Sequence, residues 1–509
     1  MSDPRVPGAV SDRLVLAVDC STTAAKVVAS DGEGRVVSSG SRPLDLSRPG
    51  AGLHEQDADQ WWTATVGALA ETVSGLGPDA RAVAAVAVTH QRESFVLLDG
   101  AGRPLRPAIC WLDSRAGEEI AELGTDRVRD LSGKPPDVTP ALYKLAWLAR
   151  HEPGVLRGAE TVQEVHGFLA GRLTGHRTTS TGSADSLGLL DLRRGTWSPE
   201  LTALAGLRAD QLPGLAPPGR VLAPLTPEVA ARLGLSGPVP LVSGIGDGQA
   251  AGLGANALDD DDAYVNLGTS LVMGVVSHEY LTGPAFRTLA GAEPGTFVLE
   301  TVLNAAAYLA DWFRREFGDP GAGGAVDPAL DEAAAALPEG SDGLLTVPYW
   351  NCAQTPYWDP HARGITVGWH GGHTRAHLYR SLLEGVAFEL RLHLDGLEAR
   401  TGRRIRVLRT TGGGSRSALW TRIVADVTGR EVQRCAGGEI SARGAAVLAW
   451  TGAIGGTVAE ASAAMAAFDD TVSPRPDATA RYEEFSAVQR RVYPRLREVL
   501  TDLAGVVVH

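Results

Sequence analysis

The sequence predicts an α/β fold made of two large domains, and three observations support this prediction. The chain has 509 residues, which is more than a single hydrophobic core normally holds. Short β-rich runs alternate with longer helical patterns, as is typical of α/β layers. A strand–turn–strand pattern near the start recurs in the second half. We therefore expect a disordered tail at 1–13, an N-terminal domain at 14–256 and a C-terminal domain at 257–509.

The repeated pattern is carried by "AVDCSTTAAKVV" and "YVNLGTSLVMGVV", which align without a gap. In this alignment Asp19 falls on Asn266, and Thr22 falls on Thr269. Hairpins can share such a composition by chance, but here each copy opens one half of the chain. That placement favours a duplicated fold, with a boundary in the acidic, linker-like stretch near 255–262.

Hydrophobic periodicity predicts the elements in order. We expect strands in "LVLAVD" and around the turn of "AAKVVASDGEGRVVSSG", a helix in "WWTATVGALAETV" and a buried strand in "AVAAVAVTH". A leucine or valine at every fourth position from Leu378 to Leu394 predicts a long amphipathic helix. A helix in "LWTRIVADVTG" should end at Gly429, and a closing surface helix should cover about 480–501.

The composition, with 44% hydrophobic and 21% charged residues, is ordinary for a soluble globular protein. A net charge of −13 argues against a general binder of nucleic acids or anionic membranes. The start lacks the regions of a signal peptide, and no apolar run is long enough to span a bilayer. The cysteines form no CxxC pair and fit a reducing, cytoplasmic location; they are Cys20, Cys110, Cys352 and Cys435.

Two kinds of turn could hold a nucleotide. The turns at 21–23 and 268–270 combine hydroxyls with exposed backbone N–H groups, which suits phosphate oxygens, although each alone could be a plain hairpin. Asp19 adds a carboxylate where a phosphate-bound Mg²⁺ needs an oxygen ligand. The glycines of "TTGGGSRSALW" run into a helix opened by Ser415 or Ser417, where an adenosine and its phosphates could approach the backbone.

Two further loops suit a polyol. The residues that follow a strand in "THQRESFVLLD" offer donors and acceptors in succession, as adjacent hydroxyls require. In "AICWLDSRA", Trp111 could pack on a sugar face while Asp113 and Arg115 bracket its polar atoms. The alternatives are a solvated loop with an Arg–Glu surface pair, and a core tryptophan beside a surface ion pair.

Asp247 is the single charge in "VSGIGDGQAAGLG". A carboxylate among small apolar residues is costly unless it caps a helix or takes part in chemistry. Asp247 could be the N-cap of a helix, or a general base that accepts the proton of a substrate hydroxyl. The sequence predicts that it has few pairing partners in the protein, and that its small neighbours leave room for a substrate.

Taken together and in order, these motifs resemble the FGGY family of carbohydrate kinases. The run "DCSTTAAK" is similar to that family's first phosphate motif, "NLGTS" to its second, and "GIGDGQAAGLG" to its catalytic-aspartate motif. "QRESFVLLD" and "AICWLDSRA" resemble its substrate loops. "YWDPHARGITVGW" with "HLYRSLLEGVAFELR" resembles its C-terminal signature, and "GGGSRSALWTRIVADVTGREV" its adenosine motif. The resemblance covers about 14–500.

The resemblance implies two ribonuclease-H-like domains of the actin and hexokinase type, with ATP, Mg²⁺ and a sugar meeting in the cleft between them. It assigns catalysis to Asp247 and the Mg²⁺ side to Asp19. It assigns the sugar to His90, Gln91, Arg92, Glu93, Trp111, Asp113 and Gln249. It assigns ATP to Ser21, Thr22, Thr23, Lys26, Gly268, Thr269, Gly412, Gly413, Gly414 and Ser417.

This chain departs from the family pattern in ways that bear on the substrate. Ser21 replaces a glycine of the first phosphate motif, and "QRE" is similar to glycerol kinases rather than to the "HGQ" of typical xylulokinases. Thr139 stands where glycerol kinases carry an aromatic residue, and Gly248 separates Asp247 from Gln249. The smaller side chains predict a roomier pocket, and therefore a pentulose such as xylulose.

The alternatives to a pentulose kinase are a kinase of glycerol or another short polyol, a non-catalytic sugar-binding regulator, and an ATPase of the actin or chaperone type. The resemblance is also compatible with a homodimer. The histidines of "HGGHTRAH" could bind a metal, but no acidic residue lies near them in the sequence, which favours an exposed loop.

Overall fold

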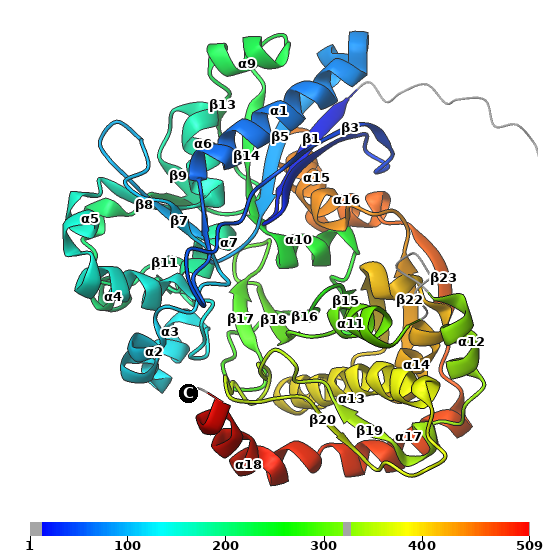
Figure 1. The fold of residues 1–509 in the computed structure, drawn as a ribbon. Coiled ribbons are helices and arrows are strands. Elements are labelled where there is room, and N and C mark those ends of the chain that lie inside the picture. Colours follow the sequence, from blue (N-terminus) through cyan, green and yellow to red (C-terminus); the bar gives the residue numbers. More distant parts are fainter. Residues whose placement is uncertain (1–12, 319–326, 508–509) are drawn as a thin grey trace, which may run out of the picture.

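The computed structural model describes residues 13–318 and 327–507, and it contains two domains, each built around a β-sheet (Figure 1). Of the tail predicted at 1–13, only Arg13 lies within the described residues. Within the described ranges, no helix combines the length and the apolar character that crossing a membrane requires.

The N-terminal sheet has six strands in the order β13-β14-β5-β1-β2-β3. Strand β1 is antiparallel to β2 and parallel to β5, and the apolar residues of β1 are fully buried. The bounds are β1 Leu14–Cys20, β2 Ala24–Ser30, β3 Val36–Pro43, β5 Val83–His90, β13 Val221–Pro224 and β14 Pro240–Gly246.

The C-terminal sheet has seven strands in the order β17-β18-β16-β15-β21-β22-β23. Strand β15 is antiparallel to β16 and parallel to β21, as β1 is to β2 and β5, so the predicted duplication of the fold is confirmed. The bounds are β15 Asp262–Leu267, β16 Leu271–Ser277, β17 Arg287–Ala290, β18 Phe297–Leu303, β21 Val407–Thr411, β22 Glu431–Cys435 and β23 Phe468–Val472.

The helices that pack on these sheets follow the predicted periodicity. α1 (Ala58–Leu76) packs on β2 and β3, and its Trp61 is fully buried. α13 (Arg375–Thr401) buries its leucine and valine stripe in the C-terminal core, and α14 (Ala418–Thr428) packs beside it. α14 begins after the Ser417 cap and ends at Gly429, which has a φ of 65°, as the sequence predicts.

The predicted closing helix is two helices, α17 (Pro476–Gln489) and α18 (Val492–Val507). The reason is Pro494, which has no N–H to continue the hydrogen bonds of α17 and whose ring would collide with the preceding turn. A proline is tolerated in the first turn of a helix, so α18 starts just before it.

Two helices from the second half of the chain lie on the N-terminal sheet (Figure 1). α15 (Ile440–Ala453) packs on β1, β5 and β14 and crosses α10 (Asp247–Gly254), and α16 (Val458–Met465) packs on α15. A Cβ on Gly444 would lie 1.9 Å from the carbonyl oxygen of Ala250, so the crossing requires glycine. Packing therefore does not follow a strict division at 256/257.

A small sheet of order β4-β7-β6-β8 carries the predicted sugar loops beside the N-terminal sheet. Its strands are β4 Glu55–Gln56, β6 Phe95–Leu98, β7 Ala108–Ile109 and β8 Thr161–Glu164. The remaining strands are β9 Thr178–Ser180, β10 Leu190–Asp191, β11 Thr196–Trp197, β12 Gly214–Ala216, β19 Leu345–Val347 and β20 Ile365–Val367. The remaining α-helices are α2 Gly117–Leu123, α3 Asp126–Ser132, α4 Ala141–His151, α5 Pro153–Gly158, α6 Val165–Thr174, α7 Thr181–Ala184, α8 Pro199–Leu204, α9 Pro227–Leu233, α11 Ala307–Phe317 and α12 Pro328–Ala335.

Candidate active site

Asp247 is the first residue of α10, directly after β14, and 38% of its side-chain surface is exposed. Its Oδ1 accepts hydrogen bonds from Arg92 Nε at 3.0 Å and from the Gly248 N–H at 2.8 Å. The expectation that Asp247 has few partners is therefore wrong, because Arg92 pairs with it. The interpretation of Asp247 as the N-cap is also wrong, because Gly246 occupies the N-cap position and no side chain there bonds to the first turn of α10.

The space beside the two glycines that flank Asp247 is filled by other side chains of the protein and is not open to a substrate. A Cβ on Gly246 would lie 2.6 Å from the Arg92 side chain, and one on Gly248 would lie 2.5 Å from Glu300 Oε2. The small residues around Asp247 are thus required by the close approach of Arg92 and Glu300. Burial raises the pKa of Asp247, while the nearby Arg92 guanidinium acts in the opposite direction.

Asp19 is the last residue but one of β1, which is parallel to β5 as β14 is, and its Oδ1 is buried without a hydrogen-bond partner among the described residues. Burial and the negative charges of Asp247 and Glu439 raise its pKa to about 7. An unpartnered carboxylate oxygen among other acids fits a hard divalent cation, which would restore the ionised form. The residues present therefore fit Mg²⁺.

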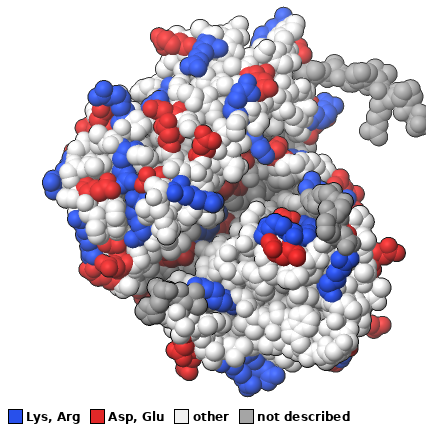
Figure 2. All heavy atoms as spheres, viewed as in Figure 1, with Lys and Arg blue, Asp and Glu red and all other residues white. Residues whose placement is uncertain are grey.

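A cavity of about 680 Å³ lies between the two domains, and Asp19 is one of the residues that line it. Lys26 lines it from β2, while Asn266, Gly412 and Gly413 line it from the C-terminal domain. Lys26 Nζ pairs with Glu439 Oε1 across the cavity at 3.0 Å. The volume is within the range of small-molecule sites, and the surface between the domains is visibly hollowed in Figure 2.

The other residues of the predicted adenosine motif support the cavity wall. Gly414 is buried, and a Cβ there would lie 2.6 Å from the Trp420 ring. Ser417 caps α14 and donates to Asp331 Oδ2 at 3.2 Å, so its hydroxyl is used inside the protein. Among the three glycines predicted for ATP, Gly412 and Gly413 face the cavity and Gly414 does not line it.

The two predicted phosphate turns have the expected form. Ser21 has an ordinary backbone conformation rather than a left-handed one, and its hydroxyl closes the turn by donating to the Ala24 carbonyl at 2.9 Å. Thr23 is exposed, and Thr22 donates to Gln91 Oε1 at 3.0 Å. The second turn is tied to α11: the carbonyls of Gly268 and Thr269 each accept a backbone N–H at 2.9 Å.

The predicted sugar segment divides into two parts. Arg92 pairs with Asp247, Glu93 pairs with Arg287 of the C-terminal domain, and Glu93 has a φ of 62°. His90 is fully buried, with its Nδ1 2.7 Å from the Gln91 carbonyl oxygen. Gln91 is 2% exposed, and its side-chain amide bonds to Thr22, Ser94 and Gln56. None of the four residues reaches an open surface, because Arg92 and Glu93 are also buried, at 7% and 4% exposed; the two parts differ in their partners.

The second predicted sugar loop is tied to the first phosphate turn. Trp111 Nε1 donates to Thr22 Oγ1 at 3.0 Å, and part of the indole stays exposed. Asp113 is fully buried and accepts from Arg115 Nε at 2.7 Å and from the His54 N–H at 2.7 Å. This ion pair is buried rather than on the surface, and it leaves Asp113 as a support of the loop.

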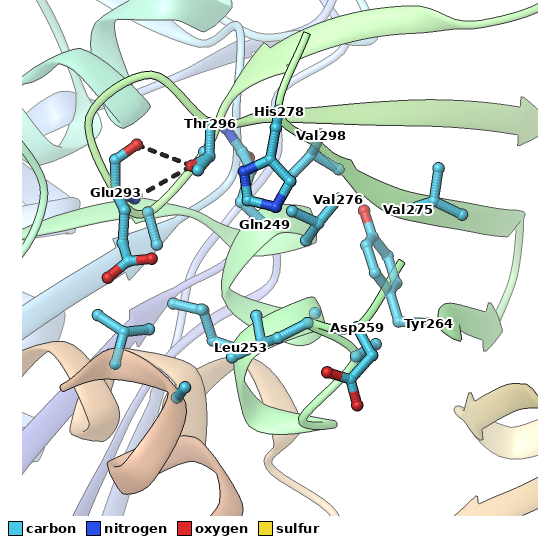
Figure 3. A pocket seen from close by; sticks show the side chains of 17 residues that line it. Gln249, Leu253, Asp259, Tyr264, Val275, Val276, His278, Glu293, Thr296 and Val298 are labelled. Carbon is cyan, nitrogen blue, oxygen red and sulfur yellow. Dashed lines mark hydrogen bonds between the residues drawn. The ribbon is translucent and has the colours of Figure 1, made fainter. Parts of the chain in front are cut away.

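Gln249 lies away from Asp247, because residues two apart in a helix point to nearly opposite sides. It lines a separate pocket of about 160 Å³ between α10, β15, β16 and β18 (Figure 3). Its Nε2 donates to the Gly182 carbonyl at 3.1 Å. Leu253 and Tyr264 also line this mostly apolar pocket, so the geometry does not support contact between Gln249 and a sugar held at Asp247.

Several residues at the site were missed by sequence reasoning. Glu300 accepts two hydrogen bonds from Arg92 Nη1, at 3.0 and 3.1 Å, and Arg287 Nη1 donates to Glu93 Oε1 at 3.1 Å. Lys144 is fully buried and donates to the carbonyls of Cys110, Trp111 and Thr139. A glutamate inside the apolar run "FVLETVL" was the available signal for Glu300, because a buried charge needs a partner.

The histidine loop does have an acidic neighbour. Asp342, His370 and His373 place one ligand atom each within 4.8 Å of one another, the one such group among the described residues. Backbone N–H groups donate to Nδ1 of both histidines, however, which places the proton of each neutral ring on Nε2. His370 Nε2 then donates to Asp342 at 3.1 Å, so this arrangement is a hydrogen-bonded loop.

Known proteins that are similar to this chain include carbohydrate kinases. Residues 14–254 match the FGGY family of carbohydrate kinases, N-terminal domain, and residues 263–453 match the C-terminal domain of that family. A xylulose kinase from Escherichia coli is 32% identical over 86% of this chain and 89% of its own length. A glycerol kinase from Bordetella parapertussis is 32% identical over 86% of this chain and 88% of its own.

The fold is also found in solved structures. The crystal structure of a xylulose kinase from Rhodospirillum rubrum superposes with a TM-score of 0.90 at 31% identity, covering 96% of this chain and 100% of that one. The expected two-domain α/β fold is thereby confirmed.

Proposed function

Because the chain belongs to the FGGY family of carbohydrate kinases, we propose that it phosphorylates a pentulose such as xylulose, with Asp247 as the general base. Family membership makes it an ATP-dependent carbohydrate kinase. The identity of the sugar and the roles of individual residues belong to the proposal. The observation that carries it is the placement of Asp247 at the start of α10, beside a cavity that contains Asp19.

In this proposal the reaction is in-line transfer of the ATP γ-phosphoryl group to a primary hydroxyl. Asp247 accepts the hydroxyl proton, and its raised pKa makes the carboxylate a better base than an exposed aspartate. Arg92 and Gly248 use only part of the carboxylate's capacity to accept hydrogen bonds. Arg92 forms ion pairs with both Asp247 and Glu300, so its single positive charge compensates the negative charge of Asp247 only in part.

Asp19 would hold Mg²⁺ with the ATP phosphates, and Lys26, Gly412 and Gly413 would contact the nucleotide. When bound, the cation neutralises charge on the phosphoryl oxygens. The protein's own contribution is to position ATP against the hydroxyl and to exclude water from the cleft.

A glycerol or other short-polyol kinase is the second candidate. It is favoured by the side chains Arg92 and Glu93, which resemble the glycerol kinase loop, and by the similarity to a glycerol kinase. No observation favours the non-catalytic regulator or the actin-type ATPase. We also propose a cytoplasmic location, in keeping with the unpaired cysteines of the described chain, and a homodimer remains a prediction.

The test is ADP release with Mg-ATP against glycerol, erythritol, xylitol, D- and L-xylulose, and D- and L-ribulose. Asp247→Asn should keep ATP and sugar binding while turnover falls by about 10² to 10⁴-fold, the usual effect of removing a general base. Asp210→Asn, at an exposed aspartate, is the matched control and should keep native turnover. Near-normal turnover of Asp247→Asn would reject Asp247 as the base.

A further inference from the structure

A chain of buried charges crosses from the C-terminal domain to the predicted sugar segment. Arg287, on β17, donates from Nε to Glu300 Oε1 at 2.8 Å and from Nη1 to Glu93 Oε1 at 3.1 Å. Glu300, on β18, is fully buried and also binds Arg92. Arg92 and Glu93, two adjacent polar residues of the predicted sugar segment, are therefore both bound by residues of the C-terminal domain.

The two guanidinium groups of this chain of charges favour the ionised form of Glu300. Burial would raise the pKa of Glu300, but Arg92 and Arg287 outweigh it and lower the pKa to about 2. Tyr264 adds a hydrogen bond to Glu300 Oε2 at 2.7 Å. Two guanidinium groups, of Arg92 and Arg287, face the carboxylates of Glu300, Glu93 and Asp247, so the arrangement depends on each partner being present.

The strand that carries Arg287 is itself fixed to the N-terminal domain. Thr288 N–H donates to the Gly133 carbonyl at 2.8 Å, and Lys134 Nζ donates to the Thr288 carbonyl at 2.7 Å. Two residues later, Ala290 N–H donates to Asp185 Oδ2 at 2.8 Å. β17 is the edge strand of its sheet, on the side nearest the N-terminal domain in Figure 1. The backbone that carries Arg287 is therefore fixed relative to the N-terminal domain, and the Arg287 side chain can bind Glu93 from a defined position.

Glu93 needs such support because of its backbone. Its φ of 62° lies in the left-handed region, which costs a non-glycine residue about 1–3 kcal/mol unless its surroundings hold it there. Among the described residues, the Glu93 carboxylate forms a hydrogen bond and an ion pair with Arg287. Arg287 Nη1 also lies 3.5 Å from Thr139 Oγ1. The space that a small residue at 139 was expected to leave is thus partly filled by a guanidinium.

We propose that Arg287 and Glu300 are positioning residues of the sugar site: they fix Glu93 and Arg92 in the orientation that receives the sugar hydroxyls. The inference rests on the proposed function. It assigns part of the sugar selectivity to β17 and β18, although neither side chain is required to touch the sugar. The choice of substrate thus depends on the interface between the domains as well as on the loop at 91–93.

The test is steady-state kinetics of Arg287→Met, which removes the charge at similar length, with the sugar that the native enzyme phosphorylates best. KM for the sugar should rise about tenfold or more, because Glu93 loses the charged hydrogen bond that orients it, and KM for ATP should stay within about twofold. Arg287→Lys should recover part of the loss, and Glu300→Gln should give the same separation of the two KM values. The control is Thr282→Ala, which removes a hydrogen bond to Asp130 across the same interface and should leave both values unchanged.

A double-mutant cycle tests whether Arg287 acts through Glu93. In a Glu93→Gln background, Arg287→Met should add less than about a twofold change to the sugar KM. An undiminished effect there, a native sugar KM in Arg287→Met, or an equal rise in both KM values would overturn the inference. Thermal unfolding of each variant identifies any that fail to fold, and Arg287→Lys then carries the test. Lack of sugar-dependent turnover in the native enzyme would instead remove the proposed function, so the two failures are distinct.

Discussion

Replacing Gly413 with alanine is expected to weaken ATP binding without weakening the fold. An alanine Cβ at this position would have one heavy atom within 4 Å, Arg416 Nη2 at 3.8 Å, and otherwise points into open space. Gly413 lines the cavity of about 680 Å³ that contains Asp19, so this open space is the cavity itself. If the cavity holds the nucleotide, as we propose, the methyl group meets the nucleotide rather than the protein.

The expected rise in KM for Mg-ATP follows because the methyl group prevents the nucleotide from approaching the backbone closely. If this weakens nucleotide binding by about 1.4 kcal/mol, KM for Mg-ATP rises tenfold. Stability should be unchanged or slightly improved, because glycine loses more conformational freedom on folding than alanine does, by about 0.4–1 kcal/mol. KM for the sugar should stay at its native value.

Gly412→Ala is the matched contrast one residue earlier. Gly412 has a φ of 85°, and its Cβ would lie 2.5 Å from Asn266 Oδ1 and 2.8 Å from the Leu267 carbonyl. The left-handed backbone alone costs an L-residue about 1–2 kcal/mol, so this variant should lose stability. Coupled ADP release and thermal unfolding measure both variants. A native ATP KM in Gly413→Ala would refute the placement of the nucleotide along this loop.

Three further outcomes are expected. Asp19→Asn should raise the Mg²⁺ concentration for half-maximal activity about tenfold or more, because it removes the carboxylate that we propose binds the cation; a Mg-ADP thermal-shift titration checks this independently. Burial raises the pKa of Glu389 to about 7. The stability that the protonated carboxyl contributes is therefore complete below about pH 4.5 and is lost as the pH rises through 7. Between pH 5 and pH 8, the free energy of unfolding of Glu389→Gln should increase by about 3 kcal/mol relative to that of the native protein. Ser21→Gly should lose about 0.5–1.5 kcal/mol of stability with an unchanged ATP KM, because the hydroxyl closes the turn through Ala24.

Each of these outcomes has a contradicting result. An unaltered Mg²⁺ requirement in Asp19→Asn would place the cation elsewhere. Equal unfolding free energies of native protein and Glu389→Gln at both pH values, from urea denaturation, would mean that Glu389 is not protonated in the fold. A changed ATP KM in Ser21→Gly would show that the hydroxyl contacts the phosphates.

Local chemistry made much of the fold predictable. The turn at 21–23, the start of a helix at Asp247 and the cap of α14 at Ser417 each depend on a few neighbouring residues, so their sequence patterns were sufficient. The same holds for the apolar stripe of α13. The single helix expected at about 480–501 is wrong, because Pro494 has no N–H to continue the hydrogen bonds of α17.

The sequence by itself therefore determined the α/β class, the repeated hairpin and the family resemblance on which the candidate roles of Asp19 and Asp247 rest. Only the tertiary structure decided which charges meet. Arg92 and Glu300 are 208 residues apart, and Glu93 and Arg287 are 194 apart, so no local pattern could pair them. The physical reason is that a buried charge must find a partner, and β17 and β18 supply it only once the two domains have come together.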